Sequence, residues 1–183
     1  MTKTLFATVL LTGLFTIQAL SQDRSWRIEN LESSVLTEIK SQVGNDTVSR
    51  KAEKGSIVQI KGVFSPPTGT ATLKLSEIKL SGKSSDSGVS TSWSFEPIGI
   101  GMTAANLCAY TFPDSIVKGK QVQSLTQGGE LGIGREKEGD EVTLSVAQAT
   151  PLCLAFPVPA TPQSEMRLQF AGSEIVVPAA VSK

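Results

Sequence analysis

The sequence predicts an all-β domain, either a sandwich or a barrel. Short runs along most of the chain alternate apolar and polar residues, which is the pattern of a strand with one buried face. Turn-forming residues separate these runs, and the 183 residues include 16 Gly and 9 Pro. The runs are also regularly spaced, so we expect many short strands rather than a bundle of helices.

The first element has the three parts of a secretory signal peptide. Lys3 supplies a basic start, residues 5–17 form an apolar run, and Ala19 and Ser21 are small residues at the −3 and −1 positions before Gln22. The run is shorter than the roughly 20 residues that span a bilayer. We therefore expect cleavage between Ser21 and Gln22, and an uncleaved membrane anchor is the alternative.

Residues 1–21 are thus expected to be a cleavable signal peptide, and residues 22–183 a single β-sandwich domain. The mature chain would lie outside the cytoplasm, in a periplasm or in the medium, where disulfides persist. It contains two cysteines, Cys108 and Cys153. An even pair in such a compartment predicts a disulfide, and two separate buried thiols are the alternative.

The start of the mature domain allows one short helix. Apolar residues within 26–43 recur at helical spacing, namely Ile28, Leu31, Val35, Ile39 and Val43. A strand that starts at Trp26 is the competing prediction. The polar stretch 44–54 is predicted to be a loop.

The rest of the chain alternates between predicted strands and turns. Residues 82–88 are rich in Ser and Gly and predict a loop, residues 99–104 predict a glycine-rich turn or bulge, and residues 135–140 predict a charged turn. The predicted strands are 56–64, 71–80, 89–98, 107–112, 122–125, 130–134, 142–147, 152–156, 166–170 and 174–177.

Composition excludes several chemistries. The chain contains no histidine, which removes Ser-His-Asp and Cys-His catalysis and nearly all zinc and copper sites. Lys plus Arg and Asp plus Glu are 17 each, so the sequence has no basic footprint for nucleic acid. We expect a protein that is not an enzyme and that has no cofactor and no nucleic-acid partner.

Two motifs carry weak chemical signals. Residues 99–104 match the Gly-x-Gly-x-x-Ala form of a dinucleotide loop, but that site needs a parallel strand–helix unit around it. Four acidic residues cluster around Gly139, and their spacing matches no calcium loop. We interpret the first motif as a turn and the second as a solvated hairpin tip, so neither predicts a metal or cofactor site.

Several runs, in order, resemble a family. Trp26-Arg27-Ile28, residues 55–64, residues 73–80, the segment 154–159 and the strand 166–170 are similar to the telokin-like, immunoglobulin-like domains of exported bacterial proteins. The resemblance implies an immunoglobulin-like β-sandwich with an interaction or accessory role and no catalytic residues. In antibody-type domains the core Trp stands between two bridged cysteines.

Trp93 precedes both cysteines here, so that disulfide arrangement is not expected.

The function we expect is an exported, non-enzymatic β-sandwich module that binds a protein or an envelope component. An unpaired edge strand would favour this function. The alternatives are a carrier of a small apolar ligand, which needs an empty apolar cavity, and a carboxylate-based glycosidase, which needs two acids across a cleft.

Overall fold

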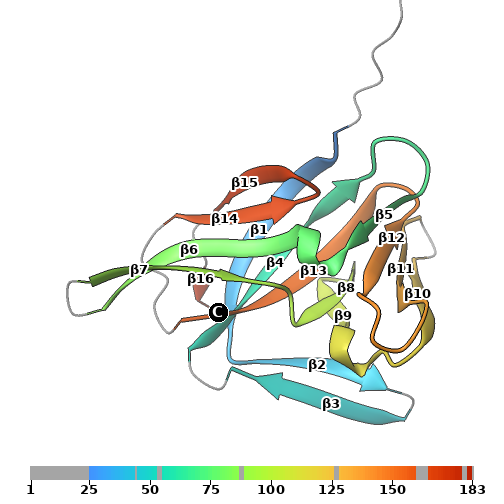
Figure 1. Cartoon of the computed structure of the whole chain (residues 1–183), viewed down its shortest axis with the longest axis horizontal. Helices are drawn as coiled ribbons and strands as arrows, with labels where there is room; N and C mark the ends of the chain where they lie inside the picture. The colour runs from blue at the N-terminus through green and yellow to red at the C-terminus, as the bar shows by residue number, and fades with distance from the viewer. Residues whose placement is uncertain are drawn as a thin grey trace, which may run out of the picture.

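The computed structural model of the chain describes residues 25–43, 45–52, 55–86, 89–125, 128–159, 165–178 and 181–182. These residues form strands and two single-turn 3-10 helices, η1 (Leu75–Glu77) and η2 (Pro113–Ser115). The prediction of an all-β sandwich is therefore confirmed. Figure 1 shows how the strands are arranged, with β1, β4 and β13 running through the middle of the molecule and smaller sheets on top of them.

The strands form three sheets, which we call A, B and C. In spatial order, sheet A consists of β16 (Val181–Ser182), β1 (Arg27–Leu36), β4 (Ser56–Ser65), β13 (Thr150–Val158), β8 (Gly99–Ala104), β9 (Leu107–Thr111), β2 (Glu38–Val43) and β3 (Asp46–Lys51). Sheet B consists of β10 (Gly119–Ser124), β11 (Glu130–Arg135), β12 (Thr143–Val146) and β5 (Ala71–Lys74). Sheet C consists of β15 (Ser173–Val177), β14 (Met166–Phe170), β6 (Ile78–Asp86) and β7 (Val89–Phe95).

The main core lies between one face of sheet A and the inner faces of sheets B and C. Its buried residues come from all three sheets. Strand alternation supplies them, as in β14, where Met166, Leu168 and Phe170 are buried and the residues between them are exposed. The rings of Phe64 in sheet A and Phe170 in sheet C lie 4.7 Å apart between centroids, which joins the two layers.

Sheet A curls until its two ends approach each other. β1 leads through Thr37 directly into β2, and β2 pairs in parallel with β9, where Ser41 lies opposite Tyr110. Strands β4, β13, β8 and β9 therefore lie between β1 and β2, which are consecutive in the chain. The concave face of the curl encloses a second, smaller core, which consists of Ile39, Ile57, Tyr110, Phe112, Cys153 and Ala155.

The predicted disulfide is present and crosses this concave face. Cys108 in β9 and Cys153 in β13 are bridged, with 6.0 Å between their Cα atoms, although β8 lies between the two strands. Two strands separated by a third lie about 9.5 Å apart in a flat sheet. The curl of sheet A brings them closer, and the bridge joins strands of one sheet. As expected from the position of Trp93, this is not the antibody-type arrangement.

The helix allowed for residues 26–43 is wrong, and the competing strand is right. A bulge between Glu29 and Glu32 inserts one extra residue opposite β4, with Asn30 at φ 53°. The extra residue resets the alternation, so Ile28 and Leu31 both face the main core. The bend at Thr37 then places Leu36 and Ile39 against the second core. The helical spacing thus arises from two irregularities in a strand.

Three predicted loops or turns are also strands. Within residues 44–54 the chain forms β3, within 82–88 it continues β6 as far as Asp86, and residues 99–104 are β8. β3 is exposed on both faces, so its sequence lacks alternation. In β8, Gly99 and Gly101 leave room for the curl, because a Cβ at Gly101 would lie 1.9 Å from the carbonyl oxygen of Ala109.

Candidate functional site

The β6–β7 hairpin forms one side of sheet C, and residues 89–92 at its outer strand are all exposed. The two strands pair without a register shift from Leu80 opposite Phe95 to Asp86 opposite Val89. β14 reaches along β6 only as far as Ser81, so the hairpin continues beyond it as a two-stranded ribbon. Figure 1 shows this ribbon projecting at the left past the ends of β14 and β15. Its far side is therefore open to solvent.

The outer strand of this hairpin, β7, presents an unprotected sheet edge. β7 pairs with β6 and with no other described strand. Its sequence, VSTSWSF, contains no charged residue and no proline. Natural sheets usually protect an edge with charge, proline, a bulge or a short strand. Apart from the two-residue β16, the other described outer strands carry charge, as Arg50 and Lys51 in β3, Lys120 in β10, Lys74 in β5 and Glu174 in β15.

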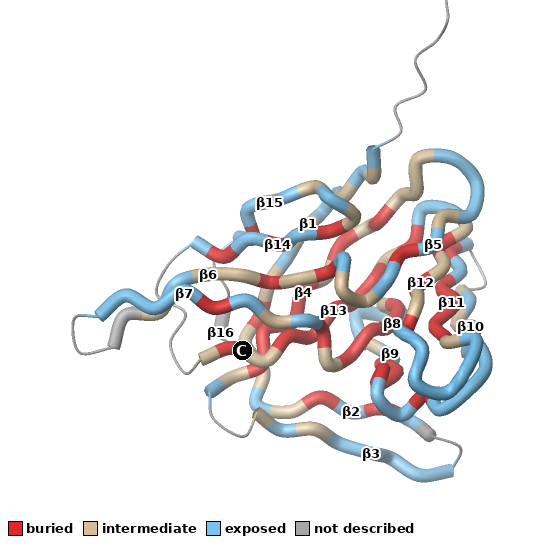
Figure 2. Tube along the Cα trace, viewed as in Figure 1, coloured by how far each residue is buried: buried red, intermediate tan, exposed pale blue. Residues whose placement is uncertain are grey.

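Trp93 fixes β7 to the sandwich. Its side chain is 8% exposed, and it lies so close to Gly82 that a Cβ there would come within 2.5 Å of the indole ring. The ring also stacks on Phe95, with 5.8 Å between centroids. The residues on either side, Ser92 and Ser94, are exposed, as is Val89 near the hairpin tip. Figure 2 shows this change along β7 from buried to exposed. Trp93 thus anchors one end of β7 to the sandwich, while the rest of the strand is exposed.

A polar hollow adjoins the β7 edge. It has a volume of about 660 Å³ and lies over β6, β7 and the start of β14. Small hydroxyl side chains line it, together with Lys83 and an ion-paired arginine, Arg167. The lining residues are Ser81, Gly82, Lys83, Ser92, Trp93, Ser94, Glu165 and Arg167. Such a surface offers hydrogen bonds to polar groups, and Trp93 and the aliphatic parts of the longer side chains add apolar area beside them.

Arg167 is the fixed charge of this hollow. Its guanidinium donates to Glu174 at 2.7 Å and to Glu165 at 3.3 Å. The hydrogen bond to Glu174 and the charges of both carboxylates raise the pKa of the Arg167 guanidinium. The Ser81 hydroxyl donates to the backbone carbonyl of Arg167 at 3.4 Å. Because all three side chains are exposed, these contacts order the surface more than they stabilise the fold.

The acidic cluster around Gly139 serves the fold. Glu141 accepts from the Ser76 amide at 2.9 Å and lies 3.9 Å from the ammonium of Lys74. Hydrogen bonds from the Ser76 hydroxyl and amide lower the pKa of Glu141. Asp140 accepts from the Lys137 amide at 3.0 Å, which closes the turn. In the described part of the chain, no group of three or more suitable side chains is placed to hold a metal ion.

A hollow of about 420 Å³ brings together four acidic side chains from three places in the sequence. Glu96, Asp114, Asp140 and Glu141 line it, and Arg50 pairs with Asp114. A glycosidase acid needs a raised pKa, whereas the pKa of Glu141 is lowered. Three of the four acids are also engaged in contacts that hold turns or strands together.

The second core contains a buried polar cluster. The Gln59 amide donates to the Tyr110 hydroxyl at 2.6 Å, and the Ser34 hydroxyl donates to the Gln59 carbonyl oxygen at 3.3 Å. Burial raises the pKa of Tyr110 to about 12, against the opposing effect of the Gln59 hydrogen bond. All three residues are less than a tenth exposed, so this cluster holds the curl of sheet A rather than a ligand.

The other predicted site residues have separate outcomes. Ser21 and Gln22, the predicted cleavage site, lie outside the described residues. Residues 99–104 form a central strand, so the backbone there has no strand-to-helix turn for a dinucleotide. None of the helices in the described residues is long and apolar enough to cross a membrane. No protein-family model, curated protein or solved structure matches this chain.

Sequence reasoning missed the continuous hairpin. Residues 82–88 looked like a loop because Ser and Gly are typical of turns, and β6 continues among them to Asp86. Residues 82–86 contain no apolar side chain, so no apolar alternation marks this part of β6. The signal that could have indicated an open edge is the run 89–95. It has the composition of a strand near Trp93, and it contains neither the charged residues nor the proline that protect an outer strand.

Proposed function

We propose that the mature chain is an exported, non-enzymatic binding module that takes up an extended segment of a partner protein at the β7 edge. The unprotected edge of β7 carries this proposal. A partner strand would hydrogen-bond to the backbone groups of β7 that face away from β6 and would extend sheet C by one strand. Its alternate side chains would contact Ser92, Ser94 and the hollow beside Arg167.

Rigidity of the edge supports this mode of binding. The Gly82–Trp93 contact and the stacked Phe95 fix β7 before any partner arrives. A preformed strand loses little conformational entropy on binding, so more of the interaction energy remains as affinity. The hydroxyls of Ser92 and Ser94 suit polar side chains of a partner segment, because they can donate and accept hydrogen bonds.

Two observations support a location outside the cytoplasm. The leader has the composition of a signal peptide, with a basic start, an apolar run and small residues before Gln22. The Cys108–Cys153 disulfide is typical of proteins that fold in an oxidising compartment. The resemblance to immunoglobulin-like domains of exported proteins would give the same class of function.

The test compares capture by three forms of residues 22–183. The wild-type chain, the Ser92→Lys/Ser94→Lys variant and the control Thr47→Lys on the β3 edge are immobilised and exposed to envelope and secreted fractions of the source cells. Lysines on β7 would place charge where the added strand lies. We expect a protein partner that the wild type and the control retain and that the double variant loses by about tenfold or more.

Equal retention by all three forms, or no partner for any of them, would contradict the proposal. Light scattering of each form distinguishes a foreign partner from a second copy of the chain. A dimer that the β7 lysines dissociate would mean that β7 binds its own copy, which overturns the assignment to another protein.

A further inference from the structure

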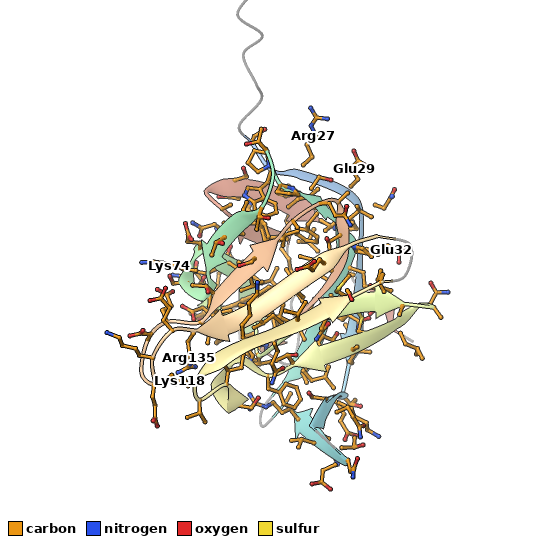
Figure 3. The ribbon with its side chains drawn as sticks, turned by 90° about the vertical axis from the view of Figure 1, so that its right-hand side faces the viewer. Arg27, Glu29, Glu32, Lys74, Lys118 and Arg135 are labelled. Carbon is orange, nitrogen blue, oxygen red and sulfur yellow. A yellow bond between two sulfur atoms is a disulfide. The ribbon has the colours of Figure 1, made fainter. Side chains whose placement is uncertain are left out.

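A second surface, separate from the β7 edge, lies on the outer face of sheet B. A groove of about 310 Å³ runs over β10, β11 and β12. Lys118, Lys120 and Arg135 line it, with the hydroxyl side chains of Thr143 and Ser145. Figure 3 views the molecule from the side of sheet B, and Lys118 and Arg135 are neighbours at the end of that face.

The floor of the groove consists of two glycines of β11. Gly132 pairs with Val122 and Ser145, and Gly134 pairs with Lys120 and Thr143. A Cβ at Gly132 would lie 2.1 Å from Cε and 2.7 Å from Nζ of Lys120. The absence of a side chain therefore lets Lys120 lie across the strands, with its ammonium over the middle of the sheet rather than at its edge.

Charge is concentrated in this groove. Three cationic side chains line it against one carboxylate, Glu136, although the whole chain has equal numbers of basic and acidic residues. The ion pairs found among the described residues involve none of the three cations. Arg135 is held at one end by a hydrogen bond to the Pro113 carbonyl at 3.1 Å. The groove lining therefore carries a net positive charge.

We propose that this groove binds an oxyanion group, a phosphate or a sulfate, carried by a small ligand. The Arg135 guanidinium and the ammonium groups of Lys118 and Lys120 supply charge-assisted hydrogen bonds to its oxygens. Lys120 covers Gly132, so the oxyanion group would contact the Lys120 ammonium there rather than the backbone. The Ser145 hydroxyl, which lies 3.1 Å from the Thr72 hydroxyl, provides a further polar contact.

The test is an NMR titration of residues 22–183 with inorganic phosphate, sulfate and glucose 6-phosphate. We expect saturable shifts of the Gly132 and Gly134 amides. The Lys118→Gln/Lys120→Gln variant should weaken binding by about tenfold, which corresponds to about 1.4 kcal/mol. The control Lys40→Gln/Lys79→Gln removes two charges from other strands and should bind like the wild type.

Two further arms identify the source of the oxyanion. Tighter binding of glucose 6-phosphate than of inorganic phosphate supports a free phosphorylated ligand. Binding to phosphatidylglycerol vesicles that Lys118→Gln/Lys120→Gln abolishes supports a lipid headgroup. An absence of saturable shifts, or equal weakening by both double variants, would overturn the site. Neither result affects the β7 edge, which lies on another sheet.

Discussion

At the scale of single residues, Tyr110 reports on the curl of sheet A. It is the one tyrosine of the chain, and its ring belongs to the second core. Gln59 binds its hydroxyl from β4, across the concave face. The state of this hydroxyl therefore depends on the closure of the sheet, and it can be read without interference from other tyrosines.

The titration of Tyr110 is the first prediction. Its pKa is about 12 in the folded chain, because burial disfavours the phenolate, and about 10 when unfolded. Phenolate absorbance at alkaline pH should therefore rise near pH 12 in the native protein and near pH 10 in denaturant. A native midpoint near 10 would mean that the second core is open to solvent.

The same shift predicts a pH dependence of stability. The unfolded chain loses the phenolic proton at lower pH than the folded chain does, so this contribution is complete below pH 10 and falls as the pH rises toward 12. The loss should reach about 2–3 kcal/mol. Urea unfolding of the wild type and of Tyr110→Phe at each pH isolates it, because the variant lacks the titrating group. Parallel profiles would contradict the assignment.

Gly101 tests the close approach inside the curl. The substitution Gly101→Ala places a Cβ against the backbone of Ala109, which no side-chain rotation can relieve. We expect a loss of about 3 kcal/mol or more in unfolding free energy. The control Gly62→Ala in β4, whose Cβ would meet nothing closer than 3.2 Å, should cost much less. Equal costs, measured by urea unfolding, would mean that β8 and β9 are not so close.

At the scale of elements, the disulfide holds β9 and β13 together across β8. Its cysteines are 45 positions apart, so the bridge restricts a long loop of the unfolded chain. Reduction, or the Cys108→Ser/Cys153→Ser variant, should lower the unfolding free energy by about 3–4 kcal/mol. Urea unfolding with and without reductant measures this. A reductant effect on the double variant would reveal a cause other than the bridge.

Strands with one buried face could be predicted from the sequence, and exposed or irregular strands could not. β12 and β14 alternate cleanly and were predicted close to their observed bounds. β1 was ambiguous because the bulge at Glu29 and Glu32 breaks its period. β3 has solvent on both faces, so neither burial nor alternation marks it. Residues 82–86 of β6 contain no apolar side chain that could alternate.

The ends of β13 illustrate a limit of proline as a stop signal. The sequence predicts a strand over residues 152–156, which ends before Pro157, but β13 continues to Val158. β13 pairs on both sides only from Leu152 to Ala155, and Pro157 faces β4 alone. Because no strand pairs with Pro157 on its other side, the N–H group that proline lacks is not needed there, and the strand tolerates it. The sequence cannot indicate this without knowing where β8 ends.

The sequence allowed an unpaired edge strand to be considered as a binding site, but it did not indicate which strand this would be. An unpaired edge was expected to favour a binding module, but which strand would be outermost depends on sheet order. That order follows from long-range pairing, as between β6 and β14, which no local pattern encodes. The groove on sheet B depends in the same way on Lys120 lying over Gly132, from a neighbouring strand.

At the scale of the whole molecule, the compartment has a direct test. The protein purified from its native location should have the intact mass of residues 22–183, with Cys108 and Cys153 oxidised. Cleavage after Ser21 follows from the small residues at the −3 and −1 positions. A mass that includes residues 1–21 would contradict the prediction of a cleavable signal peptide.

The sandwich has an uncharged outer strand, β7, and hydrogen exchange can show whether a partner adds to it. Amide exchange of residues 22–183 is measured alone and with the partner recovered in the capture experiment. Strand addition predicts that amides of residues 89–95 exchange more slowly in the complex, while those of the β3 edge do not change. Protection elsewhere, with unchanged exchange along β7, would contradict the account.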